Sequence, residues 1–154
     1  MRRKEKHITN RKEMDAIIAA SPVCRVAMAR DNQPYLVPLS FGYDGHAVYI
    51  HTAAVGKKID FFETNPLVCV EFEHHVQLRA HSSEACKFSF SFECVIAEGT
   101  IEELVDAPEK KRGMDLIMRH YADDRSWHYH ETLLAKTRVW KINILELNGK
   151  RSLA

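Results

Sequence analysis

The sequence predicts a mainly β protein, a small antiparallel β-barrel with peripheral helices at its rim. Two observations predict this class: about six strand-like segments occur with about three helical ones, and hairpin-type turns rather than regular helical crossovers join the strands. The 154 residues are 45% hydrophobic and 28% charged, as in ordinary globular domains. We therefore expect residues 1–154 to form a single domain.

Each expected element has its own local signal. The expected strands are short apolar or alternating runs, at residues 23–29, 35–43, 47–52, 67–73, 88–102 and 138–147. The expected helices are segments with apolar residues on one face, at residues 10–20, 57–65 and 106–121. Asn10 and Asp106 are favoured N-cap residues, and prolines follow the first two helices. The segment 74–85 is polar and aperiodic, and we expect a loop there.

Asp44-Gly45 is the strongest hairpin signal in the chain, because a type I′ turn requires positive φ at both central residues. It predicts that strands 35–43 and 47–52 are antiparallel neighbours. Pro38 lies within the first of these strands and has no N–H to donate. It therefore needs a sheet edge, a bulge, or a rim that faces something other than another strand.

An alternating apolar row marks the long strand at 88–102. Its members share one face of the strand, and they are Phe88, Phe90, Phe92, Cys94 and Ile96. This row is expected to face a core or a second subunit.

The charge balance excludes a strong global field. Lys and Arg number 22 against 21 Asp and Glu, a formal net charge of +1, so we expect neither a nucleic-acid nor a membrane partner. The four cysteines form no CxxC pair, which favours reduced thiols and a cytoplasmic location. No signal-peptide or membrane-spanning run is recognisable.

The helix expected at residue 57 begins with the wrong charge. Lys57 and Lys58 lie at the positive end of the helix dipole, where cations are unfavourable. Either both are solvated surface charges, or they form a phosphate site with Gly56, the free N–H groups of the helix start and the Thr52 hydroxyl. The sequence contains neither GxGxxG nor GxxxxGK[ST], so the usual dinucleotide and triphosphate cradles are absent.

Several motifs occur in a fixed order between residues 25 and 73: DxxPYxVPxSFxY, the DG hairpin, YIHTA, GKKID and NPxVCVE. Together they resemble the flavin-binding half of the pyridoxamine 5′-phosphate oxidase-like split-barrel superfamily, and most closely its nitroimidazole-resistance (Nim-type) branch. The resemblance continues more weakly through residues 91–104, 118–121 and the terminal NGK, so it spans nearly the whole chain.

The resemblance implies a six-stranded antiparallel split β-barrel that forms a homodimer and binds FMN in two clefts between the subunits, with FAD as the less favoured alternative. The implied cofactor-binding residues fall into three groups: the backbone of Val37, Pro38, Leu39 and Ser40 against the flavin ring, His51, Thr52 and Ala53 beside the flavin, and Lys57 and Lys58 on the phosphate. Residues of the other subunit, from 88–94 or around Trp140, would close the cleft.

The implied function is an oxidoreductase that transfers electrons from reduced flavin to a small flat substrate such as a nitroaromatic, with NAD(P)H binding only transiently. His51 is the candidate catalytic residue, because an imidazole titrates at about pH 6.5 and exchanges protons readily. The alternative for His51 is a structural strand histidine. A non-catalytic flavin carrier or sensor, a pyridoxamine-phosphate oxidase proper and a metal-binding module are the alternative functions.

Two histidine-rich regions offer possible metal ligands. One contains His74, His75, His81 and Cys86, and the other His120, His128 and His130. Their spacing is irregular, which favours ordinary polar surface, and we expect no metal site.

Overall fold

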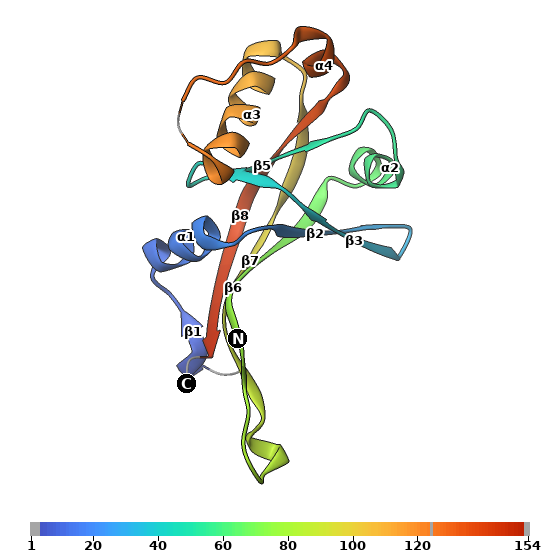
Figure 1. Cartoon of the computed structure of the whole chain (residues 1–154). Helices are drawn as coiled ribbons and strands as arrows, with labels where there is room; N and C mark the ends of the chain where they lie inside the picture. The colour runs from blue at the N-terminus through green and yellow to red at the C-terminus, as the bar shows by residue number, and fades with distance from the viewer. Residues whose placement is uncertain (1–3, 124, 153–154) are drawn as a thin grey trace.

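A computed structural model describes residues 4–123 and 125–152 of the chain. One antiparallel sheet dominates it, with strand order β3-β2-β6-β7-β8-β5-β4 and with β1 pairing to β8 (Figure 1). The strands are β1 (His7–Ile8), β2 (Cys24–Arg30), β3 (Gln33–Leu39), β4 (Phe41–Tyr43), β5 (Ala47–Thr52), β6 (Leu67–Arg79), β7 (Ser89–Leu104) and β8 (Arg138–Ser152). The expected class, a mainly β antiparallel barrel with few helices, is confirmed.

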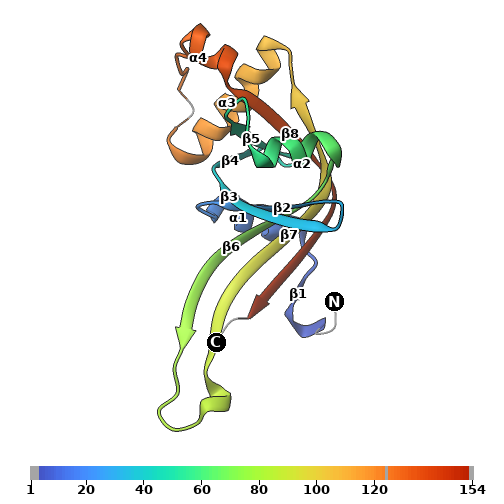
Figure 2. The same ribbon diagram turned by 90° about the vertical axis from the view of Figure 1, so that its right-hand side faces the viewer.

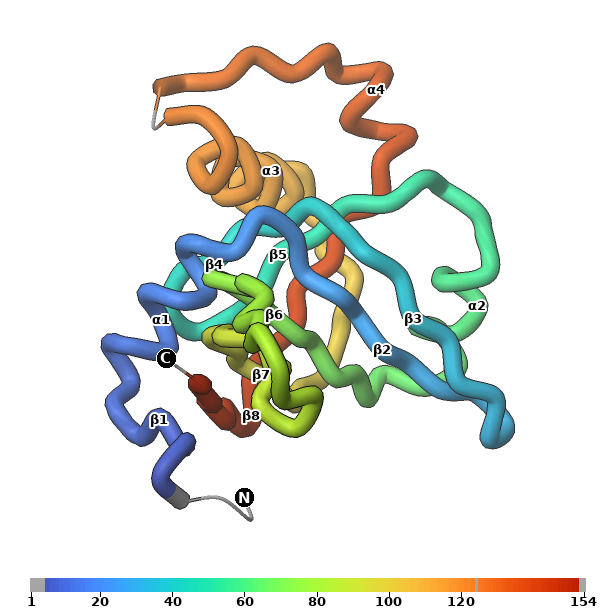
Figure 3. Tube along the Cα trace, turned by 60° about the horizontal axis from the view of Figure 1, so that its bottom comes forward, coloured from blue at the N-terminus to red at the C-terminus, as the bar shows by residue number. Residues whose placement is uncertain are grey.

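Ser40 divides the expected strand 35–43 into β3 and β4. The two halves lie at opposite edges of the sheet, β3 against β2 and β4 against β5. The sheet therefore curls until its two edges meet at a single residue, and Figure 3 shows the strands surrounding the interior. This division and the short β1 account for eight strands where six were expected.

The helices cover the open parts of the barrel. They are α1 (Arg11–Ala20), α2 (Lys57–Thr64), α3 (Ala107–Tyr121) and α4 (Glu131–Lys136). The Asn10 side chain caps α1 by accepting a hydrogen bond from the Lys12 N–H at 2.9 Å. The apolar faces of α1 and α2 enter the same core, which also contains the inward residues of every strand except β3.

A second, smaller cluster lies under α3. Leu116 and Ile117 pack there with Tyr49 and Val139 from β5 and β8. Gly42 on β4 allows this approach, because a Cβ at that position would lie 2.5 Å from the Leu116 carbonyl carbon and 2.6 Å from the Ile117 nitrogen.

The hairpin between β4 and β5 is confirmed, but its predicted turn type is wrong. Of its two central residues only Gly45 has a positive φ, at 90°. The Asp44 carboxylate accepts hydrogen bonds from the N–H groups of His46 and Ala47 at 2.9 and 2.8 Å, so the aspartate side chain shapes the loop. Two consecutive positive φ angles occur instead at Asp31 and Asn32, 49° and 62°, between β2 and β3.

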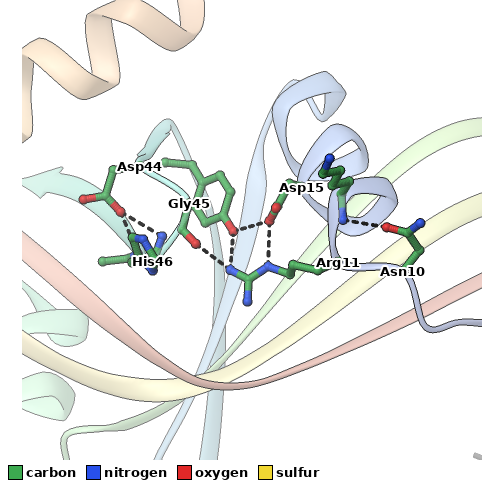
Figure 4. Close-up of polar contacts among 9 residues, drawn as sticks. Asn10, Arg11, Asp15, Asp44, Gly45 and His46 are labelled. Atoms are coloured by element: carbon green, nitrogen blue, oxygen red, sulfur yellow. Dashed lines mark hydrogen bonds and ion pairs between the residues drawn. The ribbon is translucent and has the colours of Figure 1, made fainter.

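A polar network joins this hairpin to α1 (Figure 4). Arg11 pairs with Asp15 at 2.9 Å and donates to the Tyr43 hydroxyl and the Gly45 carbonyl. Tyr43 in turn donates to Asp15 at 2.6 Å. Burial, and then the bond to this carboxylate, raise the pKa of Tyr43 to about 12, so the hydroxyl remains a donor throughout the neutral range.

Strands β6 and β7 extend further than the sequence predicted. Residues 74–79, expected as loop, pair with 89–93 across a bulge between His74 and Gln77. The extension, which we call the arm (residues 74–92), projects beyond the barrel in both side views (Figures 1 and 2). Alternation failed as a signal here because this segment is solvated on both faces and has no single buried side.

The alternating row on β7 does not face the protomer's core. Val95, Ala97 and Ile101 point inward, and Phe88, Phe90, Phe92, Cys94 and Ile96 occupy the outer face. Of the two expectations for this row, a core or a second subunit, the first is therefore wrong. Both faces of this strand are apolar over part of its length, so the period of two did not reveal which one was buried.

All four cysteines are free, as the sequence predicted. No helix in the part of the chain that the structure describes is long and apolar enough to cross a membrane.

We expect Gly42→Ala to lower the free energy of unfolding by about 3 kcal/mol, because the added methyl group collides with α3 backbone rather than with a side chain that is free to move. Chemical denaturation followed by circular dichroism measures the change. Ser82→Thr, which adds a methyl group at an exposed arm position, is the control and should change stability little. Equal stability of the two variants would contradict the close packing of β4 on α3.

Candidate functional site

The candidate site begins where two paired strands separate. Strand β4 pairs with β5 as far as Phe41 opposite Ile50. The next residues, Ser40 and His51, are not partners, because β3 pairs with β2 instead. The last residue of β3, Leu39, lies opposite Cys24 of β2. The two backbones diverge like the sides of a fork, with residues 37–40 on one side and 51–53 on the other.

The fork brings together two of the three groups of residues that the sequence singled out. On one side Pro38 and Ser40 are exposed and Val37 and Leu39 are partly buried. Because β3 is an edge strand with only β2 beside it, a residue without an N–H is tolerated at Pro38. On the other side His51 and Ala53 are exposed and Thr52 is buried.

Helix α2 brings the third group to the fork. The Lys57 ammonium lies 4.6 Å from the centre of the Tyr35 ring on β3 and 5.6 Å from that of Phe61. Lys58 lies close enough to His51 on β5 to affect its pKa. Neither lysine pairs with a carboxylate among the residues that the structure describes, so two uncompensated cations face the fork.

The start of α2 also offers free backbone donors. Inside the helix the first N–H groups bonded to Gly56 are those of Ile59 and Asp60, which leaves the N–H groups of Lys57 and Lys58 without helical acceptors. Gly56 has a φ of 142°, which residues with a Cβ rarely adopt, and nothing lies within 4 Å of the place where a Cβ would stand. An anion thus has room and donors at this corner.

His51 faces outward between two buried residues, Ile50 and Thr52. Partial burial of its ring by the surrounding chain, and then the positive charge of Lys58, lower the pKa of His51 below its ordinary value, although the residue as a whole is exposed. The imidazole is therefore neutral at pH 7 and able to accept a proton.

The Thr52 hydroxyl is engaged inside the barrel. It accepts a hydrogen bond from Trp140 Nε1 at 3.0 Å and donates to the Ala53 carbonyl at 2.9 Å. Thr52 thus presents its backbone to the fork, while its side chain fixes the exit of β5. The Trp140 side chain is itself buried in the barrel.

Arg138 joins α2 to the same network. Its guanidinium pairs with Glu63 at the end of α2 at 2.8 Å and with Glu103 on β7, and it lies 4.6 Å from the centre of the Trp140 ring. Trp140 also packs against Phe62 of α2, with ring centres 5.2 Å apart. Helix α2 and the end of β5 are therefore held in a fixed relation, which positions Lys57 and Lys58 relative to His51.

Two residues of α3 fix the other side of the fork. The Tyr121 hydroxyl accepts from the Phe41 N–H at 3.1 Å and donates to the Pro22 carbonyl at 3.0 Å. His120 shares a hydrogen bond with the Ser21 carbonyl at 2.9 Å and packs on the Phe41 ring. The family resemblance included residues 118–121 (MRHY) but implied no role for them. In the structure His120 and Tyr121 anchor the point at which β3 and β4 separate.

No group of three or more His, Cys, Asp or Glu side chains in the described ranges 4–123 and 125–152 is arranged to hold a metal ion. His74 and His75 stack on each other, and His75 lies 3.3 Å from Glu93. His81 accepts from the Glu84 N–H within the arm. His74, His75 and His81 thus make local contacts within and beside the arm.

A family model described as pyridoxamine 5′-phosphate oxidase matches residues 10–151. A curated protein of Rhizobium meliloti, uncharacterized in function, is 32% identical over 76 residues, and the match covers 49% of this chain and 50% of the relative. The matched part thus spans about half the length of that relative.

Solved structures resemble the whole fold. A Bacteroides thetaiotaomicron protein provisionally assigned to 5-nitroimidazole antibiotic resistance is 29% identical, with a TM-score of 0.83 over 94% of this chain and 86% of its own. A FAD-binding protein of Mesorhizobium loti is 26% identical, with a TM-score of 0.72 over 96% and 98%. A FAD- and heme-binding protein of Mycobacterium smegmatis, at 20% identity and a TM-score of 0.86 over 97% and 74%, supports the fold alone.

We expect Trp140→Phe to lower the free energy of unfolding by about 1 kcal/mol, because it removes the hydrogen bond to Thr52 and keeps most of the packing. Trp127→Phe is the matched control, since its indole N–H bonds to the Asp123 carbonyl at 3.3 Å at the surface. Urea denaturation of both variants measures the difference. An equal effect of the two substitutions would contradict a special role for the buried bond.

We expect the pKa of His51, measured by NMR titration, to lie below the ordinary histidine value of about 6.5. Lys58→Met should raise it only in part, because burial is the larger cause. Since the unfolded chain binds this proton more tightly, His51 should reduce stability as the pH falls below about 6.5. A pKa at or above the ordinary value would contradict the electrostatics of the fork.

Proposed function

Since the chain belongs to the pyridoxamine 5′-phosphate oxidase family, we propose that it is an FMN-binding oxidoreductase. In this proposal the fork holds the flavin, and reduced flavin passes electrons to a small flat substrate. The observation that carries the proposal is the pair of cations, Lys57 and Lys58, without carboxylate partners in the described structure, at a helix start with free N–H groups beside a diverging strand pair.

The residues present fit an FMN phosphate at the start of α2. A phosphate carries close to two negative charges, which Lys57, Lys58 and the helix dipole would offset. The open space over Gly56 allows the backbone to approach the anion closely. Binding would also offset the unfavourable interaction between the two lysines and the positive end of the helix dipole.

The two sides of the fork fit the rest of the cofactor. The exposed backbone of residues 37–40 would lie along the flat ring, and residues 51–53 would flank it. A bound flavin supplies the electron transfer itself. The protein's part is to orient the ring and to place a neutral imidazole, His51, where a proton is taken up or released.

The substrate proposed is a nitroaromatic or a similarly flat acceptor. The similarity to a protein provisionally assigned to 5-nitroimidazole resistance supports this choice. The FAD named for the Mesorhizobium loti relative makes FAD the alternative cofactor. Free thiols at all four cysteines support a cytoplasmic setting, where NAD(P)H is available as a transient donor.

We also propose that two copies form a homodimer and that the site lies between them. The fork is open to solvent at Pro38, Ser40 and His51, and a ring bound there would keep an exposed face. A second copy would cover that face, exclude water and complete the substrate cleft.

The alternative is a flavin carrier or sensor without turnover. It is favoured by one specific observation, the lack of a GxGxxG fingerprint for a nicotinamide donor. The absorbance spectrum of freshly purified protein, followed by extraction and identification of its chromophore, establishes whether FMN or FAD is bound. Anaerobic titration with NADH, NADPH and chemically reduced mediators then separates an enzyme, which is reduced and reoxidised by a nitroaromatic, from a carrier, which is not.

We expect the double variant Lys57→Ala, Lys58→Ala to weaken FMN binding roughly 30-fold or more, because two charge-assisted contacts to the phosphate are lost. Riboflavin, which lacks the phosphate, should bind with nearly unchanged affinity. Fluorescence titration of both ligands measures the two constants. Lys12→Ala with Lys136→Ala, two exposed lysines elsewhere, is the control. Equal losses for FMN and riboflavin would refute the phosphate assignment.

A further inference from the structure

The arm exposes apolar side chains that its own barrel does not cover. Figures 1 and 2 show it projecting beyond the body of the molecule. The exposed fractions are 49% for Val76, 58% for Leu78, 49% for Phe88 and 51% for Phe90. Side chains of this size, gathered on one projecting element, are typical of a surface that another molecule covers.

These side chains lie on one face of the arm. Leu78 is directly opposite Phe90 in the register, and residues two apart on a strand share a face. A two-stranded ribbon with one apolar face is marginally stable in water by itself. The tip is nevertheless ordered by its own bonds, with Lys87 paired to Glu84 at 2.6 Å and the Glu84 N–H donating to His81 at 3.1 Å. The arm is thus an ordered ribbon whose apolar face is available for packing against another surface.

A single apolar row continues from the arm along the barrel, with Glu71 and Glu73 beside it on β6 and Lys150 beside it on β8. Phe92, Cys94 and Ile96 extend the row on β7. At the far end of the same strands the outer face contains a shallow hollow of about 650 Å³. We define the hollow by five of its lining residues: Ala27, Leu67, Cys69, Glu98 and Leu145. Leu67 and Leu145 are exposed there by 60% and 70%.

The total exposed area points to a second copy as the missing layer. The chain exposes 9541 Å², whereas a compact monomer of its 17.8 kDa exposes roughly 8,000 Å². The excess of about 1,500 Å² exceeds the roughly 800 Å² per partner of a standard interface and lies in the range of obligate homodimers.

A two-fold axis lying across the strands would bring the arm of one copy to the hollow of the other. Phe90 and Thr100, the register partner of Leu67, lie on the same strand and about 34 Å apart. In a two-fold pair of sheets packed face to face, with the axis lying across the strands, the end of one face covers the opposite end of the other. Each arm then meets the hollow of the other copy, and the contact occurs twice.

We propose that each arm packs its apolar face into the hollow of a second copy of this chain. The proposal rests on the pairing of two copies in the proposed function, but not on the flavin. It identifies the arm, an extension of two barrel strands, as the element that holds the dimer together.

The test is sedimentation equilibrium of the full chain and of three double variants. The arm variant is Phe88→Ser with Phe90→Ser, and the hollow variant is Leu67→Ser with Leu145→Ser. The control, Val105→Ser with Leu133→Ser, removes exposed apolar side chains near α3 and α4, at the other end of the molecule from the arm (Figure 1). The wild type should be a dimer, and the arm and hollow variants should each raise its dissociation constant roughly 100-fold. The control should leave it unchanged.

Combining the arm and hollow variants distinguishes contact from coincidence. If the two surfaces touch, the four substitutions together raise the dissociation constant of the dimer by less than the product of the two separate fold-changes. A combined fold-change equal to the product of the separate ones, or an effect of the arm variant alone, would mean that the arms pair with each other or with another molecule. Either result would overturn the proposal. A monomeric wild type would overturn it as well.

Hydrogen exchange of the wild type gives a test without substitutions. Amides in residues 76–79 and 89–92 should exchange more slowly above the dissociation constant of the dimer than below it. Exchange independent of concentration would contradict the proposal. A dimer that depends on arm and hollow but binds no flavin would refute the proposed flavin site and leave this inference intact. A monomer that binds flavin would overturn this inference and the proposed homodimer, and would leave flavin binding at the fork intact.

Discussion

The constraint on which the structure depends is that the two edge strands of the sheet are consecutive in the chain. Only Ser40 separates β3 from β4, and neighbouring Cα atoms are about 3.8 Å apart. The row of hydrogen-bonded strands that runs from β3 at one edge to β4 at the other must therefore curl until the two edges meet. The same turn ends the pairing with β5 after Phe41 and opens the fork. Barrel closure and the candidate site are therefore one event. Tyr121 holds that point by bonds to Phe41 and Pro22.

Charge at the fork is organised in two layers. The polar groups of the inner layer are paired with one another, since Arg138 is shared between Glu63 and Glu103 and the Thr52 hydroxyl is satisfied by Trp140 and Ala53. The outer layer, Lys57 and Lys58, has aromatic and imidazole neighbours but no carboxylate partner in the described structure. A rigid support beneath uncompensated cations is what a pre-organised anion site requires, because little must move when the anion arrives.

Local patterns predicted most of this structure. The caps at Asn10 and Asp106, the helix after Gly56 and the sheet edge, one of the three positions that Pro38 allowed, are each a consequence of one or two residues, and the structure contains them. Long-range features escaped prediction. The division at Ser40 depends on which strands β3 and β4 find, the arm depends on pairing between residues 74–79 and 89–93, and the Trp140–Thr52 bond joins residues 88 positions apart. No period or cap in the sequence encodes such choices, although the PYxVPxSFxY motif marked the right place.

The single-residue link at Ser40 also limits how related chains can differ. An insertion there would let the barrel open and move both sides of the fork at once, so variation in length is tolerated poorly at this position. The tip of the arm adjoins neither edge of the sheet. Changes in loop length that adapt this scaffold to different small molecules should therefore accumulate there, leaving the fork itself unchanged.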